Sequence, residues 1–153
     1  MQLKNAMDSK DERILQELST DGRISNAELA KRVALSPSSC LRRVQELERS
    51  GVIRGYRAIL DAGRLGRGFT AYVAVGIADH SKSSQRAFEE AIAVSEAVRE
   101  CHNVTGNFEY LLRVECSDLA AYKVFHSDVL GQIPQVTLIN SYVVMESPKD
   151  LRA

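Results

Sequence analysis

The chain has 153 residues, 44% of them hydrophobic and 26% charged, which is the composition of a globular protein with a buried core. Its 20 basic and 20 acidic residues balance, and no apolar stretch approaches the roughly 20 residues that cross a bilayer. The polar N-terminus lacks the apolar core of a signal peptide, so we expect a cytoplasmic protein with no membrane partner.

The three cysteines are Cys40, Cys101 and Cys116, an odd number without a Cys-x-x-Cys pair. This pattern argues against a disulfide framework and against a compact zinc site. We expect reduced thiols that pack as small apolar groups, with no metal and no cofactor bound.

Charge is distributed unevenly along the chain. Residues 1–66 hold 12 basic and 9 acidic side chains, whereas residues 67–153 hold 8 and 11. The contrast is sharpest over residues 23–57, with 8 basic against 3 acidic side chains. A locally basic segment beside a mildly acidic remainder predicts that the first part of the chain contacts nucleic acid.

Two short helices are predicted at the start of this basic part. The first follows Asp8, has acidic residues in its first turn to suit the helix dipole, and ends at Asp21-Gly22. The second follows Ser25, which forms a predicted capping box with Glu28 three residues later.

A third helix begins at Ser36, with Pro37 at the first position, where the missing N–H costs nothing. A wheel at about 100° per residue separates an apolar face from a polar one. The apolar face is formed by Cys40, Leu41, Val44 and Leu47. The polar face suits the major groove of DNA, because arginines reach guanine or phosphate oxygens and serines lie at the helix start.

The alternative interpretation is an amphipathic helix whose polar face is merely solvated. The order of three helices, the short turn at residues 34–36 and the local charge favour a helix-turn-helix that binds double-stranded DNA. The predicted DNA-binding residues are Ser25, Asn26, Ser36, Ser38, Ser39, Arg42, Arg43, Gln45 and Arg49.

Residues 52–60 are β-branched and aromatic and predict an extended segment, followed by a turn-rich stretch up to Gly66. The glycines there do not form a phosphate loop, because no Gly-Lys-Ser/Thr sequence follows them before a helix. The predicted division is a helix-turn-helix domain over 1–52, a hinge strand and linker over 53–67, a second domain over 68–147 and a tail over 148–153.

The second domain alternates strand and helix patterns. Strands are predicted over residues 69–77, 98–104, 108–116 and 136–145, with helices over 83–95 and after Asp118. The order βαββαβ is that of a ferredoxin-like sandwich, a four-stranded antiparallel sheet with two helices on one face, so the chain is of the α+β class. The uncovered face would leave an apolar patch in water, and a dimer that stacks two such faces is the expected remedy.

Four stretches resemble the Lrp/AsnC (feast/famine) transcriptional regulators. They are residues 21–30, 35–44 and 51–56 in the first part, and residues 100–112 in the second. The resemblance covers nearly the whole chain and implies a winged-helix DNA-binding domain, a hinge strand that pairs between subunits, and a module that assembles dimers into tetramers or octamers. Its small-molecule effectors are usually amino acids, held where modules of neighbouring dimers meet.

The resemblance also assigns effector-binding residues by position. The loop expected to hold the effector's charged ends is Thr105, Gly106, Asn107 and Glu109, and the last-strand segment associated with the response is Tyr142, Val143 and Val144. Gly106 would let the backbone approach a ligand closely, but Gly106-Asn107 suits an ordinary hairpin turn equally well. Leucine-responsive members of the family carry aspartate where this chain has Glu109, and the extra methylene moves the carboxylate by more than about 1 Å.

Two other classes of function compete with an effector-responsive regulator of amino-acid metabolism or transport genes. An enzyme is disfavoured, and no catalytic residue is assigned, because the histidines, cysteines and acids form no recognisable nucleophile, base and orienter. A ligand-independent architectural protein that compacts DNA shares the helix-turn-helix and the oligomer, and the polar loop at residues 105–109 favours the responsive interpretation.

Overall fold

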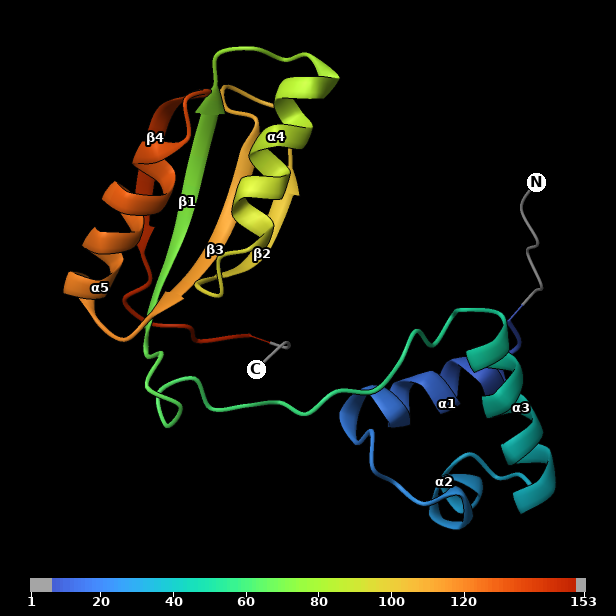
Figure 1. The fold of residues 1–153 in the computed structure, drawn as a ribbon. Helices are drawn as coiled ribbons and strands as arrows, with labels where there is room; N and C mark the ends of the chain where they lie inside the picture. Colours follow the sequence, from blue (N-terminus) through green and yellow to red (C-terminus); the bar gives the residue numbers. More distant parts are fainter. Residues whose placement is uncertain (1–6, 151–153) are drawn as a thin grey trace. The chain divides into compact units, whose positions relative to one another are not determined.

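The computed structural model describes residues 7–150 and forms two compact units that divide between Ala58 and Ile59. This division falls inside the predicted hinge and linker. The first unit contains three helices, and the second contains a sheet with helices on one face (Figure 1).

The helices of the first unit are α1 (Ser9–Thr20), α2 (Asn26–Arg32) and α3 (Pro37–Arg49). They pack around six buried side chains, which are Ile14, Leu29, Ala30, Val33, Cys40 and Leu47. The wheel is confirmed for Cys40 and Leu47, but Leu41 is 46% exposed and lies off the core.

Two helix starts differ from the predicted capping. Ser25 accepts from the Glu28 backbone N–H, as predicted, but the Glu28 carboxylate pairs with Arg32 instead of completing the box. The complete capping box lies at the start of α1, where the Asp8 carboxylate accepts from the Asp11 N–H and the Asp11 carboxylate accepts from the Asp8 N–H. This box has aspartate at the N-cap and at the third helical position, whereas the usual sequence pattern has Ser or Thr at the first and Glu or Gln at the second of these positions.

After α3 the chain turns over residues 51–53 and continues without regular secondary structure over residues 54–60. Within the described residues this segment has no strand partner, so the hinge strand implied by the resemblance is not formed by one chain alone. Tyr56, Ile59 and Leu60 are each more than half exposed along it.

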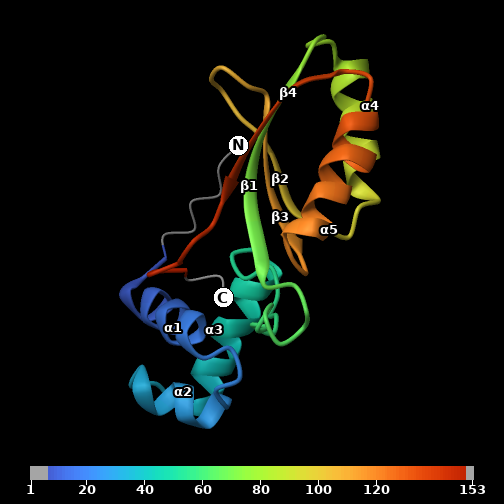
Figure 2. The ribbon, with the colours of Figure 1, turned by 90° about the vertical axis from the view of Figure 1, so that its left-hand side faces the viewer.

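The second unit has the predicted βαββαβ order. Its strands are β1 (Phe69–Ile77), β2 (Val98–Asn103), β3 (Tyr110–Cys116) and β4 (Val136–Val143), in the sheet order β2-β3-β1-β4 with antiparallel pairing. Helices α4 (Lys82–Ala93) and α5 (Leu119–Val124) cover the same face of the sheet (Figure 2). α5 continues as a π-helical turn over Phe125–Val129 and a short 3-10 turn over Leu130–Gln132, which the apolar periodicity did not distinguish from one helix.

The core of this unit lies between the sheet and the two helices. Alternate residues of β1 and β3, such as Val73 and Leu112, pack against Phe88 and Ile92 of α4 and against Phe125. The prediction of three buried thiols is wrong for Cys101, which is exposed on the edge strand β2. Cys40 and Cys116 are buried, and burial raises the pKa of both thiols.

Candidate nucleic-acid interface and ligand module

The turn between α2 and α3 places the two helices of the predicted DNA-binding motif. The Leu35 N–H donates to the Ala30 carbonyl at 2.9 Å and the Ala34 N–H donates to the Lys31 carbonyl at 3.2 Å. These two bonds form a Schellman motif, in which the residue after the C-cap takes the left-handed conformation. Here that residue is Ala34, with φ of 52°, where glycine is usual.

Side chains at the helix starts complete this turn. Ser36 caps α3 by accepting from the Ser39 N–H at 3.3 Å, and the Asn26 amide of α2 donates to the Pro37 carbonyl at 2.9 Å. Ser25 caps α2. The predicted DNA-binding residues Ser25, Asn26 and Ser36 therefore also fix the geometry of the motif. The sequence pattern predicted this structural part for the caps Ser25 and Ser36, but not for Asn26.

The outer face of α3 presents one polar stripe. Ser38, Arg42, Gln45 and Arg49 follow each other at spacings of four, three and four residues, and all four are exposed. Arg49 makes a two-pronged contact with Glu46 of its own helix, at 2.9 and 2.6 Å, whereas the described residues give Arg42 no ion pair. Arg42 is thus the cation on this stripe whose guanidinium is available to a base or a phosphate. Ser39 lies beside the stripe and is half-buried.

Arg43 points away from this stripe. Its Nη1 atom lies 2.8 Å from a carboxylate oxygen of Asp8 and 2.8 Å from one of Asp11, both at the start of α1. The side chain is 24% exposed, and its Nε atom is buried without a hydrogen-bond partner among the described residues. The helical wheel puts Arg43 on the flank of the polar face, and the structure places its side chain in the contact between α3 and α1.

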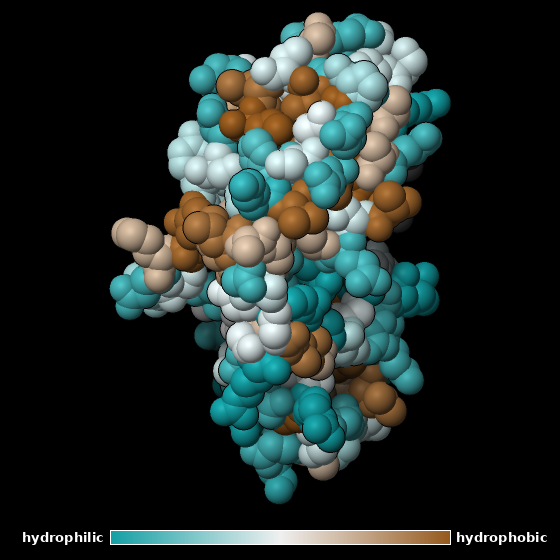
Figure 3. Space-filling model, turned by 60° about the vertical axis from the view of Figure 1, so that its left-hand side comes forward, coloured by the Kyte–Doolittle hydropathy of each residue, from teal (hydrophilic) through white to brown (hydrophobic). Residues whose placement is uncertain are grey.

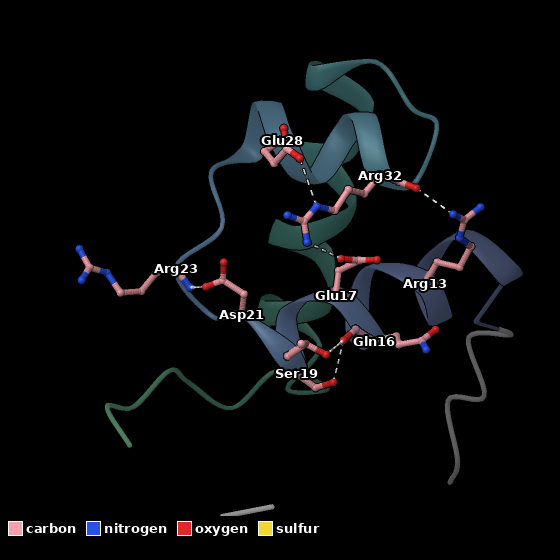
Figure 4. A network of polar contacts seen from close by, with 9 residues as sticks. Arg13, Gln16, Glu17, Ser19, Asp21, Arg23, Glu28 and Arg32 are labelled. Carbon is pink, nitrogen blue, oxygen red and sulfur yellow. Dashed lines mark hydrogen bonds and ion pairs between the residues drawn. The ribbon is translucent and has the colours of Figure 1, made fainter. Parts of the chain in front are cut away.

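A second set of contacts holds α2 to α1 (Figure 4). Arg32 of α2 pairs with Glu17 of α1 at 3.0 Å, while Arg13 and Lys10 of α1 donate to carbonyls at the end of α2, at 2.8 and 2.7 Å. Cations at a helix C-terminus suit the helix dipole. In the same view the Arg23 guanidinium points away from the other labelled side chains.

In the second unit the predicted effector loop is a hairpin between β2 and β3. The Val104 N–H donates to the Glu109 carbonyl at 2.9 Å, and Thr105, Gly106 and Asn107 form its exposed tip, with Gly106 at φ of 142°. The geometry is that of a turn that needs glycine.

The Glu109 carboxylate reaches back from this hairpin to the end of β1. One oxygen accepts from the Ile77 N–H at 2.8 Å, and the other lies 3.1 Å from Nε2 of His80. The Glu109 side chain is 22% exposed, whereas that of His80 is 68% exposed. Glu109 is therefore fixed by the backbone on one side and faces a displaceable imidazole on the other.

Gly76 lies beside this contact and permits the close pairing of β1 with β4, which the pattern of strand residues did not predict. A Cβ atom on Gly76 would lie 2.9 Å from Cβ of Leu138 and 3.6 Å from the Glu109 carboxylate. Any side chain there would push β4 away from β1.

The two parts of the predicted effector site do not meet in one chain. Tyr142 of β4 pairs with Tyr72, and the Val144 N–H donates to the Thr70 carbonyl, so residues 142–144 lie at the start of β1. Glu109 lies at the other end, beside Ile77. Ile77 is five residues along the strand from Tyr72, and this span of about 16 Å is longer than one amino acid.

The uncovered face of the sheet mixes apolar and charged side chains. On this face Leu138 and Tyr142 are 37% and 59% exposed. Apolar residues also reach the surface along the side of the unit where β4 and α5 lie (Figure 3). Glu115 is only 7% exposed on this face and pairs with Arg113 at 2.7 Å, with Arg99 at 3.6 Å and Arg67 at 4.0 Å nearby. The predicted open face is confirmed, but part of it is charged.

A shallow pocket of about 310 Å³ lies between α4 and β2. Tyr110 lines it and donates to Glu89 at 2.8 Å; burial and this bond raise the pKa of Tyr110 to about 12. The described residues contain no group of three or more His, Cys, Asp or Glu side chains placed to hold a metal ion. No helix within residues 7–150 is long and apolar enough to span a membrane.

Comparisons with known proteins match both units. Residues 7–54 match the model of a winged helix-turn-helix DNA-binding domain, and residues 70–153 match that of the Lrp/AsnC ligand-binding domain. The chain is 41% identical over 143 residues to the leucine-responsive regulatory proteins of Escherichia coli K12 and Klebsiella pneumoniae, covering 94% of this chain and 87% of each relative.

Solved structures agree with these matches. A transcriptional regulator of Neisseria meningitidis, crystallised with L-methionine, superposes with a TM-score of 0.90 at 35% identity, over 94% of this chain and 93% of that one. An AsnC family transcriptional regulator of Agrobacterium tumefaciens superposes with a TM-score of 0.88 at 35% identity, over 94% of both chains.

Proposed function

The chain belongs to the Lrp/AsnC family of DNA-binding transcriptional regulators, which is not a family of enzymes, and on this premise we propose that it is a sequence-specific, amino-acid-responsive regulator. We propose that it acts in the cytoplasm on genes of amino-acid metabolism or transport. The observation that carries the proposal is the exposed stripe of Ser38, Arg42, Gln45 and Arg49 on α3, within a matched helix-turn-helix domain.

On DNA, α3 enters the major groove with this stripe facing the bases. Arg42 is assigned to a base or phosphate, and the hydroxyl of Ser38 near the helix start to a phosphate. Ser25, Asn26, Ser36 and Ser39 remain candidates for phosphate contacts because they surround the two helix starts. Arg43 is left out of the contacting set because its guanidinium is paired inside the unit.

The proposed effector is an amino acid held by the hairpin at residues 105–109. The Glu109 carboxylate would accept the effector's ammonium group, and the hairpin tip would bind its carboxylate. The regulator of N. meningitidis crystallised with L-methionine supports this class of ligand. Because residues 142–144 lie at the far end of β1, an effector that contacts both segments would do so through two different chains.

Association of chains is the next part of the proposal. Leu138 and Tyr142 are among the apolar side chains exposed on the open face, and the segment 52–60 has no strand partner within the described part of one chain. We propose a dimer that covers these surfaces and assembles further into tetramers or octamers. Light scattering of the purified protein should show a species of at least two chains, and Leu138→Lys should shift it toward the monomer.

A selection experiment tests the function as a whole. A pool of random duplexes is enriched on the protein, and affinity for the selected duplex is then measured by anisotropy with each of the twenty amino acids. We expect a selected sequence and at least one amino acid that changes affinity or oligomer size. Selection without any response to amino acids would favour the ligand-independent architectural protein, and enrichment of no sequence would refute the sequence-specific regulator.

A further inference from the structure

The contact between α1 and α3 includes a charged cluster that the proposed DNA contacts do not use. Arg43 projects from the middle of α3 to Asp8 and Asp11, at 2.8 Å from each. The Asp11 side chain is 19% exposed and the Asp8 side chain 50%. Hydrogen bonds to Asp11 and then Asp8 raise the pKa of the guanidinium, which is charged in any case and is paired with both carboxylates here.

This cluster joins the middle of one helix to the first turn of another. Asp8 and Asp11 form the capping box of α1, and their backbone and carboxylate groups already constrain one another. The other contacts between α1 and α3 are apolar, around Ile14 and Cys40, and such contacts are weakly directional. Among the polar side-chain contacts within residues 7–58, the Arg43 cluster alone joins α1 to α3.

The direction of α3 decides where its outer stripe meets the bases. A change in the rotation or tilt of this helix displaces Ser38, Arg42 and Gln45 together, and hydrogen bonds to base edges tolerate little displacement. Charge-assisted bonds from one guanidinium to two carboxylates are both strong and directional.

We propose that Arg43 is a positioning residue for DNA recognition, which fixes α3 on the capping box of α1 through Asp8 and Asp11 and does not itself contact DNA. This inference rests on the proposed DNA-binding function. It assigns two acidic residues a favourable part in binding a polyanion.

The acidic residues give the sharpest test, because direct electrostatics and positioning predict opposite results. Asp8→Asn with Asp11→Asn removes two negative charges yet keeps oxygens that cap α1, since asparagine is as good an N-cap as aspartate. Direct electrostatics predicts tighter binding to any duplex. Positioning predicts that affinity for the selected duplex falls at least about fivefold, the lower end of one lost base contact, with no loss on a scrambled duplex.

A matched control carries the same change in charge without touching Arg43. Glu12→Gln lies in the first turn of α1, and Asp21→Asn follows its end; neither residue contacts Arg43 in the structure. This double variant should bind both duplexes as tightly as the wild type or more tightly. Far-UV circular dichroism at the assay temperature checks that every variant is folded, so a loss of binding cannot come from unfolding.

Arg43→Gln completes the test. It should lower affinity for the selected duplex by a similar factor and leave the salt dependence of binding to the scrambled duplex unchanged. Combined with the aspartate variant it should cause no further loss of affinity, because the effects of partners in one interaction are not additive. If Arg43→Gln weakens binding to both duplexes while the aspartate variant binds more tightly, Arg43 contacts phosphate and the inference is wrong. If neither changes the selected affinity, it is also wrong. Failure of the wild type to select a sequence would instead refute the proposed function.

Discussion

Replacing Ala34 by glycine should stabilise the first unit. Ala34 occupies the left-handed position of the Schellman motif after α2, with φ of 52°. An L-residue loses about 1–2 kcal/mol in this conformation, whereas glycine adopts it without steric cost. Glycine in turn makes the unfolded chain more flexible, which costs about 0.4–1 kcal/mol.

The net gain expected from Ala34→Gly is about 0.5–1 kcal/mol. Both Schellman bonds are made by backbone groups and persist, since the side chain at residue 34 takes no part in them. The chain contains a natural comparison, because the equivalent position after α3 is Gly51, with φ of 76°. For a unit of this size the gain corresponds to an increase of about 2–8 °C in Tm.

Urea titration of the full chain, followed by circular dichroism at the helix band, measures this change in the unfolding transition of the first unit. Ala27→Gly is the matched control, because Ala27 is exposed within α2, where glycine lowers stability by up to about 1 kcal/mol. An unchanged or lower midpoint for Ala34→Gly, beside the expected fall for Ala27→Gly, would refute the assignment of strain to Ala34.

Three further outcomes follow from single contacts. Arg42→Ala should weaken binding to the selected duplex by about 1–3 kcal/mol, measured by anisotropy, while leaving oligomer size unchanged. The Asp11 N–H and then Arg43 hold the pKa of Asp8 below its usual range, so the ionised Asp8 stabilises the fold at pH values above the ordinary aspartate pKa. This contribution is lost as the pH falls below about 4. The urea midpoint of Asp8→Asn should therefore decline less steeply with acid than that of the wild type. Gly76→Ala should lower the free energy of unfolding by about 2 kcal/mol or more, because its Cβ would lie 2.9 Å from Cβ of Leu138, and calorimetry should show the corresponding fall in Tm.

Each of these has an outcome that counts against it. Full affinity of Arg42→Ala would remove Arg42 from the contacting set. An acid profile identical in the wild type and Asp8→Asn would show that other carboxyl groups control acid unfolding. A Gly76→Ala variant as stable as the wild type would show that β4 can shift without loss of packing.

Local signals in the sequence predicted most of the elements. Ser36-Pro37 and Asp118 mark helix starts that the structure confirms, and the alternation over residues 69–77 matches the bounds of β1. Such features depend on a few neighbouring residues, because a cap or a period of two is complete within one element.

What sequence reasoning missed depends on contacts between distant residues. Arg43 lies on the flank of the wheel, and only the packing of α3 on α1, 32 residues away at Asp11, turns it inward. The bond from the Ile77 N–H to Glu109 likewise joins residues 32 positions apart. A polar side chain at a given helix position can face solvent, DNA or a neighbouring helix, and periodicity alone does not distinguish these environments.

The separation of the two predicted effector segments bears on how a ligand would reach the DNA-binding unit. In one chain, Glu109 and Tyr142 lie at opposite ends of β1, so a ligand bound at one end leaves the other untouched. If neighbouring chains place these ends together, the ligand changes the contact between chains rather than the shape of either one. A ligand shifts an equilibrium only by its difference in affinity for the two states, so the responsive states would be two arrangements of subunits. The spacing of the α3 helices would then follow the arrangement, and each Arg43 cluster would keep its own α3 fixed while the distance to the next changes.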